Sequence, residues 1–381
     1  MLGTAGLLGL LSLASATSVT PRQSSNDSTA CNNAASLCSK SYGDITHLGA
    51  HDSPFLRDSS TGNSISGNQY YNTTVQLDAG VRLVSAQVHD SDSQWRLCHS
   101  SCDLLDAGRL RTWLSEIKSW LDSNPNEVVT VLLVNSDGAT ASDLATEFEA
   151  ANITDYAYTP TSQSAPSSWP TLQELIDAGT RLMTFVASLD DNSGATYLMD
   201  EFTYIFENPY DVTSPSNFSC TADRPSSVKG NAASAISANM LPLQNHFLYQ
   251  TIVLDYQAPN ESYVGTTNAP SGGEGNLGDA ASACQTAWGR QPAFILVDFF
   301  DKGPAIETVD KLNGVSNPVG RTNVTAVAED EESSASTYSN VFKGLVDLVR
   351  SAQAGASTSM GDWIWAGGDW GEILGGGIAL S

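Results

Sequence analysis

The chain has 381 residues, enough for one large domain or two small ones, and 41% of them are hydrophobic, which is ordinary for a globular core. Acidic residues number 42 against 17 basic residues, so the formal net charge is −25. This balance argues strongly against nucleic acid as a partner, because phosphate backbones are bound by clustered Lys and Arg. It also disfavours simple electrostatic adhesion to anionic membranes.

The first residues predict secretion. An apolar stretch over residues 7–13 precedes small residues at 14–16, a pattern typical of a signal peptide over residues 1–16. A buried N-terminal helix is the alternative. We expect a leader over residues 17–40, which are rich in Ser, Thr and Asn. Six Asn-X-Ser/Thr sites agree with an extracellular glycoprotein: Asn26, Asn72, Asn152, Asn217, Asn260 and Asn323.

The cysteine count is even, at six, which in an oxidising compartment predicts disulfides. Pairing by nearness along the chain gives Cys31–Cys38, Cys98–Cys102 and Cys220–Cys284, and nearness is the only argument for it. No Cys-x-x-Cys pair occurs, and the histidines do not complete a zinc pattern, so we expect no metal bound through cysteine.

From residue 41 to residue 313, apolar runs of strand length alternate with helical patterns. We expect strands over residues 44–50, 80–88, 95–98, 127–134, 181–187, 202–206, 251–254 and 293–297. We expect helices over residues 110–124, 141–151, 171–178, 278–288 and 305–312, with Thr171 as a helix cap. Repeated strand–helix units favour an α/β barrel of the TIM type over a doubly wound sheet.

After residue 313 the pattern loosens. We expect residues 314–381 to form an extension packed on the barrel, with an amphipathic helix over residues 338–352 and a tail that carries Trp363, Trp365 and Trp370. A substrate-side or membrane-interface role for the aromatic tail is the alternative to simple packing.

Polar residues follow the apolar runs within a few positions. In a barrel the C-terminal strand ends carry the chemistry, so this fold would gather most of them at one end. They are His51, His99, Asn135, Asp190, Glu207, Asp255 and Asp298.

His51 and His99 are the residues best fitted to proton transfer. One imidazole can take a proton from an attacking hydroxyl while the other gives one to the leaving oxygen of a phosphodiester. Asp52 is adjacent to His51 and so is expected to turn towards His99, leaving Asp298 to orient His51. Each carboxylate would fix a tautomer and favour the charged imidazole. The alternative is that both histidines are merely packed and hydrogen-bonded.

The segments LGAHDSP, GVRLVSAQV, WRLCH, NPNEVVTVLLV and FILVDFF resemble the X-domain of phosphatidylinositol-specific phospholipases C, in their secreted fungal and bacterial branch. The resemblance implies a distorted TIM barrel and a phospholipid or other phosphodiester substrate, with transient contact with a membrane surface. It implies that His51 is the general base towards the inositol 2-hydroxyl and that His99 is the general acid towards the diacylglycerol oxygen. Asp52 and Asp298 match the supporting carboxylates, and the product would be a cyclic inositol phosphate.

The chain departs from this family at the second strand. Gly80 and Arg82 fit, but Ser85 and Gln87 stand where the family carries charged residues that bind phosphate or calcium. Since calcium needs several anionic oxygens, we expect no catalytic metal and no cofactor. Gln87 would donate a neutral hydrogen bond to the phosphate, and His89, if protonated, would supply a cation under acidic conditions.

Asn135 and Asp255 complete the expected substrate contacts. Asn135 stands near the position of another carboxylate in the calcium-dependent branch, and Asp255 follows a predicted strand. Two other functions stay open. The chain could be a weak or inactive relative that binds a phosphorylated ligand or glycan at the cell surface. It could also be a glycoside hydrolase that uses two carboxylates such as Glu207 and Asp298.

Overall fold

The computed structural model describes residues 30–253 and 256–327. The predicted signal peptide, most of the leader, the helix expected over residues 338–352 and the Trp-rich tail lie outside the described residues. Within the described part of the chain, no helix combines the length and the apolar character needed to cross a bilayer.

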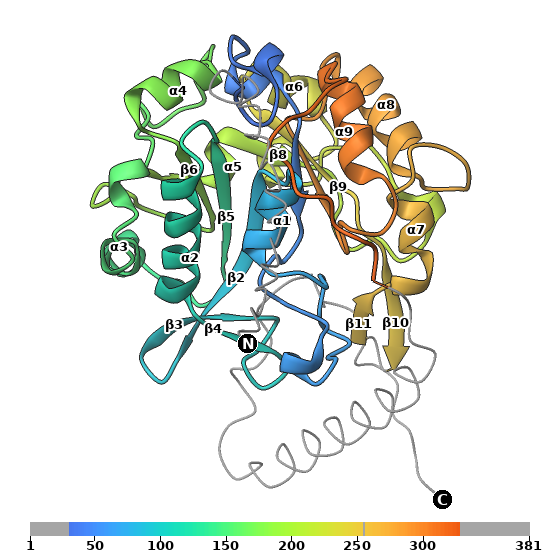
Figure 1. Ribbon diagram of the computed structural model, residues 1–381, viewed down its shortest axis with the longest axis horizontal. Coiled ribbons are helices and arrows are strands. Elements are labelled where there is room, and N and C mark those ends of the chain that lie inside the picture. The colour runs from blue at the N-terminus through green and yellow to red at the C-terminus, as the bar shows by residue number, and fades with distance from the viewer. Residues whose placement is uncertain (1–29, 254–255, 328–381) are drawn as a thin grey trace, which may run out of the picture.

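Parallel strands form the wall of a barrel and follow one another around it in chain order (Figure 1). β1 pairs with β2 on one side and with β12 on the other, so the first and the last wall strands of the chain lie side by side in the curled sheet. β7 and β8 are not paired with each other, and the short helix α5 joins them. The wall strands are β1 (His47–Ala50), β2 (Leu83–Ser91), β5 (Val129–Asn135), β6 (Leu182–Ala187), β7 (Leu198–Asp200), β8 (Ile205–Glu207), β9 (Leu241–Asn245) and β12 (Phe294–Val297). The predicted TIM-type barrel is confirmed, with an open seam between β7 and β8.

Helices cover the outside of this wall (Figure 1). α2 is typical: its buried residues recur at helical spacing and pack on the sheet, while its other face meets solvent. α4 begins where predicted, because the Thr171 side chain accepts a hydrogen bond from the Glu174 amide. The helices are α1 (Thr73–Ala79), α2 (Leu110–Ser123), α3 (Ala141–Ala150), α4 (Leu172–Ala178), α5 (Glu201–Tyr204), α6 (Ala232–Ser237), α7 (Val264–Thr267), α8 (Leu277–Trp288) and α9 (Ala305–Asn313).

A strand is found over residues 251–253 of the predicted range 251–254, but its expected place in the wall of the barrel is wrong. β10 (Tyr249–Val253) pairs antiparallel with β11 (Tyr256–Pro259) in a separate hairpin. The wall strand is β9, which precedes it and contains Pro242, a residue that argues against a central strand because it cannot donate to the ladder. Its carbonyl still accepts a hydrogen bond from the Ala293 amide at 2.9 Å, so the pairing with β12 is kept.

The strand predicted over residues 95–98 is confirmed as β3 (Gln94–Cys98), but it lies outside the wall, because it pairs antiparallel with β2 and β4 (Asp106–Arg109). One further strand prediction needs correction. Residues 202–206 belong mainly to α5 and only then to β8. The β3–β4 pair and the β10–β11 hairpin project from the same end of the barrel, the end at which β2 and β9 finish (Figure 1).

The interior of the barrel is packed with large apolar side chains from alternate strand positions, among them Leu83, Phe185, Leu243 and Phe294. A second cluster lies between the wall and the helices. Gly49 faces the interior, and a Cβ built there would lie 2.7 Å from atoms of both Leu83 and Leu296. The interior of the barrel therefore leaves no room for a side chain at position 49 of β1.

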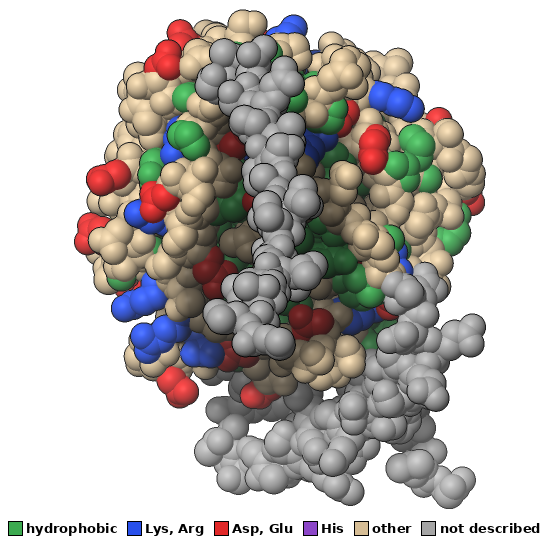
Figure 2. Space-filling model, in the orientation of Figure 1, with side chains coloured by type: hydrophobic (Ala, Val, Ile, Leu, Met, Phe, Trp, Pro, Cys, Tyr) green, Lys and Arg blue, Asp and Glu red, His purple; other side chains and the backbone are tan. Residues whose placement is uncertain are grey.

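The three predicted disulfides are confirmed: Cys31–Cys38, Cys98–Cys102 and Cys220–Cys284. On the described part of the face shown in Figure 2, acidic, basic and apolar side chains are interspersed. Beyond α9 the described chain runs back over the barrel, where the Val319 amide donates to the Asn33 carbonyl and the Thr322 amide donates to the Asp78 carbonyl.

Candidate active site

His51 and Asp298 meet because they follow neighbouring strands. His51 comes directly after β1 and Asp298 directly after β12, and the His51 amide donates to the Val297 carbonyl at 2.9 Å. His51 Nδ1 lies 2.9 Å from Asp298 Oδ1, which also accepts from the Asn68 amide at 3.0 Å. The carboxylate thus favours a proton on Nδ1 and leaves Nε2 as the ring atom available for chemistry.

The plane of the His51 ring is set by aromatic neighbours. Phe247, which follows β9, stacks on it with ring centroids 3.7 Å apart and an interplanar angle of 2°, and Tyr249 meets it edge-on at 6.5 Å. Since Asp298 fixes one ring nitrogen and Phe247 one ring face, His51 has little rotational freedom.

Asp52 lies between the two imidazoles. Its Oδ2 is 3.7 Å from Nε2 of His51 and 3.5 Å from Nε2 of His99. Its side chain is almost completely buried, and its backbone takes a left-handed conformation with φ 48°. This turn, uncommon for a residue other than glycine, aims the carboxylate back towards the interior.

His99 reaches the site from the loop that follows β3, not from a wall strand. The Cys98–Cys102 disulfide closes this loop around it, and its amide donates to the Leu105 carbonyl at 3.0 Å. The edge of its ring meets Phe55 with centroids 5.4 Å apart. Two imidazoles from distant parts of the chain therefore point their Nε2 atoms at one carboxylate oxygen.

The surroundings shift the pKa values of the two imidazoles in opposite directions. Burial disfavours the charged form of His51, but the charges of Asp52 and Asp298 outweigh burial, and the pKa of His51 is raised above its ordinary value. For His99, burial outweighs the attraction of Asp52, and its pKa is lowered. In the free protein His51 is thus the more basic of the two.

His89 lies on β2, two residues beyond Gln87 on the same side of the strand. Its side chain is largely buried, and Nδ1 faces Asp137 at 3.3 Å. Its Nε2 is buried without a hydrogen-bond partner among the described residues. One ring nitrogen of His89 is thus paired with a carboxylate, and the other is left for a further partner.

Asn135 is not brought into this cluster. In the register of β5 it pairs with Val88, on the outward alternation of the wall. Its amide donates to the Ala139 carbonyl at 2.9 Å and accepts from the Ala139 amide at 2.7 Å, which ties the loop before α3. We therefore leave Asn135 out of the site. Asp255, the other expected contact, lies outside the described residues.

Glu207 ends β8 and is paired within the protein. It binds Arg224 and accepts a hydrogen bond from the Asn245 amide at 3.2 Å. Asp298 is likewise taken up by His51 and Asn68. Both carboxylates are bonded to other side chains of the protein, so the geometry does not favour the glycoside hydrolase alternative.

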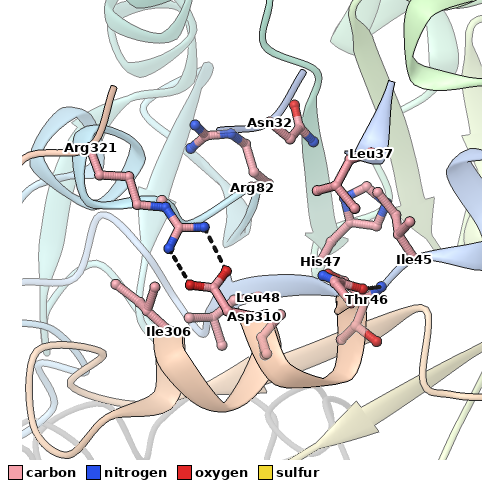
Figure 3. Close-up of a pocket in the computed structure, with 13 residues that line it drawn as sticks. Asn32, Leu37, Ile45, Thr46, His47, Leu48, Arg82, Ile306, Asp310 and Arg321 are labelled. Carbon is pink, nitrogen blue, oxygen red and sulfur yellow. Dashed lines mark hydrogen bonds and ion pairs between the residues drawn. The ribbon is translucent and has the colours of Figure 1, made fainter. Parts of the chain in front are cut away.

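His47 shares a face of β1 with His51 but lies at the other end of the strand. It borders a small pocket with Thr46, Arg82 and Arg321, in which the Arg321 guanidinium is paired with Asp310 (Figure 3). Nε2 of His47 bonds the Tyr42 carbonyl, and burial lowers its pKa to about 4. His47 is a neutral residue of the packed interior.

Among the contributors that were not predicted are Asn68, Phe247 and Ser85, whose hydroxyl accepts a hydrogen bond from the Asp52 amide. Asn68 and Phe247 lie in irregular segments, where no periodicity reports direction. In the described part of the chain, no group of three or more His, Cys, Asp and Glu side chains is arranged to hold a metal ion.

The family model described as PI-PLC X 1 matches residues 37–313. A PI-PLC X domain-containing protein 1 of Arthroderma benhamiae is 37% identical over 287 residues, covering 75% of this chain and 90% of that protein. An uncharacterized secreted protein of the same fungus is 37% identical over 294 residues, covering 75% of this chain and 64% of that protein. A PI-PLC X domain-containing protein of Arabidopsis thaliana is 27% identical over 262 residues, covering 65% of this chain and 55% of that protein.

Solved structures with a similar course of the chain include the phosphatidylinositol-specific phospholipase C from Listeria monocytogenes. It has a TM-score of 0.49 and 16% sequence identity, over 72% of this chain and 95% of that one. A mutant of the Staphylococcus aureus enzyme has a TM-score of 0.46 and 16% identity, over 71% of this chain and 93% of that one.

Proposed function

Because the chain belongs to the PI-PLC X domain family, we propose that it is a phosphoric diester hydrolase or lyase that works without a metal on an inositol phospholipid or a related phosphodiester. The observation that carries this proposal is the convergence of Nε2 of His51 and Nε2 of His99 on one point, each ring beside a carboxylate. Two such groups suit in-line transfer, which needs one proton removed and one supplied on opposite sides of phosphorus.

In the proposed reaction, His51 Nε2 accepts the proton of the inositol 2-hydroxyl as its oxygen bonds to phosphorus. The bond from phosphorus to the glycerol oxygen breaks, and His99 Nε2–H donates a proton to that oxygen. The products are a cyclic inositol phosphate and diacylglycerol. Asp298 and Asp52 balance the positive charge that moves from one imidazole to the other.

Location outside the cell belongs to the same proposal. It is supported by the predicted signal peptide, by three disulfides, which persist in oxidising compartments, and by the secreted character stated in the name of one Arthroderma relative. Its substrate would then be presented on a membrane surface or as a soluble diester.

The test is turnover of phosphatidylinositol vesicles in the presence of a chelator. We expect the wild type to release diacylglycerol, and His51→Ala and His99→Ala each to lower kcat by about 10²- to 10⁴-fold. Lys118→Ala, on the outer surface of α2, is the control for handling and stability. Turnover that requires an added divalent ion, or that survives both histidine variants, would contradict the proposal.

We assign to His89 the stabilisation of negative charge on the phosphate. Position 87 of the second strand carries no cation, and His89 keeps a buried ring nitrogen without a partner among the described residues, on the same side of β2 as Gln87. His89→Gln should lower kcat/KM, because a neutral amide donates a weaker hydrogen bond to a charged phosphate than an imidazolium does. His246→Gln, at a buried histidine paired with the Thr267 carbonyl, is the matched control. A kcat/KM in His89→Gln equal to that of the wild type would remove His89 from the site.

The absence of a phosphate-binding cation at position 87 also favours the second candidate, a protein that binds a phosphorylated ligand without turning it over. The same preparation decides between them. Absence of turnover on phosphatidylinositol, on glycosyl-phosphatidylinositol anchors and on lysolipids, together with His51-dependent binding of inositol phosphate, would favour the binding protein.

A further inference from the structure

Gln87 occupies the position where the family resemblance leads us to expect a phosphate-binding cation, and both ends of its amide are bonded within the protein. Nε2 donates to Asp52 Oδ2 at 2.7 Å, and Oε1 accepts from the Ser100 amide at 2.8 Å. One side chain on β2 is thus tied both to the carboxylate between the imidazoles and to the residue next to His99.

Asp52 needs such support, because its backbone conformation is unfavourable. Residues other than glycine adopt a left-handed φ infrequently, and such a conformation persists where the surroundings enforce it. β2 supplies two supports. The Ser85 hydroxyl accepts a hydrogen bond from the Asp52 amide at 2.8 Å, and the Gln87 amide holds the carboxylate.

The oxygen that Gln87 holds is the one that faces both imidazoles. Asp52 Oδ2 accepts the Gln87 N–H and lies 3.7 Å and 3.5 Å from the two Nε2 atoms. A buried carboxylate without that amide donor would take its hydrogen bond from the nearest imidazolium instead. The side chain would then close on one histidine and occupy the space between the two.

We propose that Gln87 is a positioning residue that holds Asp52 and the loop of His99 at a fixed separation, and that it does not bind the phosphate. Its effect on the reaction rests on the proposed function. Its effect on the two imidazoles belongs to the free protein and can be measured without substrate.

The first arm of the test is an NMR titration of the imidazoles, which is practicable because the chain has five histidines. In Gln87→Met, of similar size, we expect the pKa values of His51 and His99 to rise, since Asp52 is left to pair with them. Gln87→Glu should also raise both pKa values, while its carboxylate still accepts the hydrogen bond from the Ser100 amide. This variant replaces Gln87→Met in the titration if the methionine variant does not fold. Gln244→Met, a buried strand glutamine beside His246, should leave both values unchanged.

The second arm is kinetic and uses phosphatidylinositol vesicles. Gln87→Met should lower kcat by about 10- to 100-fold with KM within about twofold of wild type. Gln87→Arg, which supplies the cation of the family, should also lower activity, because an arginine cannot accept from Ser100. A raised KM with unshifted imidazoles, or a gain of activity in Gln87→Arg, would overturn the proposal. If the wild type turns over no substrate, the proposed function fails, while the titration still decides the role of Gln87.

Discussion

His51 and His99 are the same kind of side chain in two electrostatic settings. Two carboxylates raise the pKa of His51, and burial lowers that of His99. The proposed reaction needs His51 neutral and His99 charged, which is the less populated of the two singly protonated forms, and such a pair still has a bell-shaped dependence of kcat/KM on pH. The lower limb then reports the lower pKa, that of His99, and the upper limb the higher pKa, that of His51.

Asp298→Asn tests this ordering. Removing the charge that raises the pKa of His51 should move the upper limb of the profile to lower pH, and the weakened hold on Nδ1 should lower kcat on the order of 100-fold. Asp301→Asn removes an equal charge that does not contact His51 and should leave the upper limb in place. An upper limb unchanged in Asp298→Asn would show that His51 does not set it.

Contacts of individual residues were predictable where they follow regular strands. Because β1 and β12 are parallel neighbours, residues just beyond their ends meet, and this places His51 beside Asp298. Asn135 is the last residue of β5, and its side chain lies on the side of the strand that faces away from the barrel interior, which its position along the chain does not reveal. Phe247 and Asn68 come from irregular segments, so the sequence held no periodic signal for them.

Among the elements, the loop between β3 and β4 determines where His99 lies. It is closed by a disulfide and contains Ser100 in a left-handed conformation with φ 59°. A short closed loop has few conformations, so a catalytic group on it is held in place before substrate arrives.

The double variant Cys98→Ser/Cys102→Ser should therefore lose activity as well as stability. We expect about 2 kcal/mol of lost stability from the relaxed loop and a fall in kcat of about tenfold or more. Cys31→Ser/Cys38→Ser, which opens a loop of similar size away from the imidazoles, should lose comparable stability and keep kcat. Equal kcat values for the two double variants would show that the disulfide does not position His99.

The elements that were predicted well are those with long uniform patterns. β5 and β6 are continuous apolar runs, and α2 has an unbroken helical stripe. β7 and β8 have three residues each, too few to show a hydrophobic periodicity. β9 was not predicted, because Pro242 argues against a central strand. β10 has the composition of a wall strand, and only its antiparallel pairing with β11 shows that it lies outside the wall.

For the molecule as a whole, buried titratable groups set the range of pH in which the fold is most stable. Burial beside Glu207 raises the pKa of Glu201, which lies on α5 at the seam of the barrel, well above its ordinary value. The contribution of the buried, protonated Glu201 to stability is fully present below pH 4.5. It is lost as pH rises from 4.5 towards the raised pKa. His47 and His246, with pKa values lowered by burial to about 4, oppose folding as pH falls from 6.5 towards 4.

Glu201→Gln should thus be more stable than the wild type at neutral pH, because glutamine needs no proton to be buried beside Glu207. The difference in melting temperature should vanish near pH 4, where the wild-type carboxyl is already protonated. Glu149→Gln, the same change on the exposed face of α3, should show no such dependence. A variant that is less stable than the wild type at both pH values would mean that the Glu201 charge supports the seam.

The central claim is that His51 removes a proton and His99 supplies one to the leaving oxygen. The most direct measurement compares each alanine variant on phosphatidylinositol and on an inositol phosphate ester of nitrophenol, whose leaving group needs no proton. We predict that His99→Ala recovers most of its lost rate on the nitrophenyl ester, while His51→Ala is equally impaired on both. Recovery by His51→Ala in place of His99→Ala, or equal impairment of both variants on both substrates, would contradict the account.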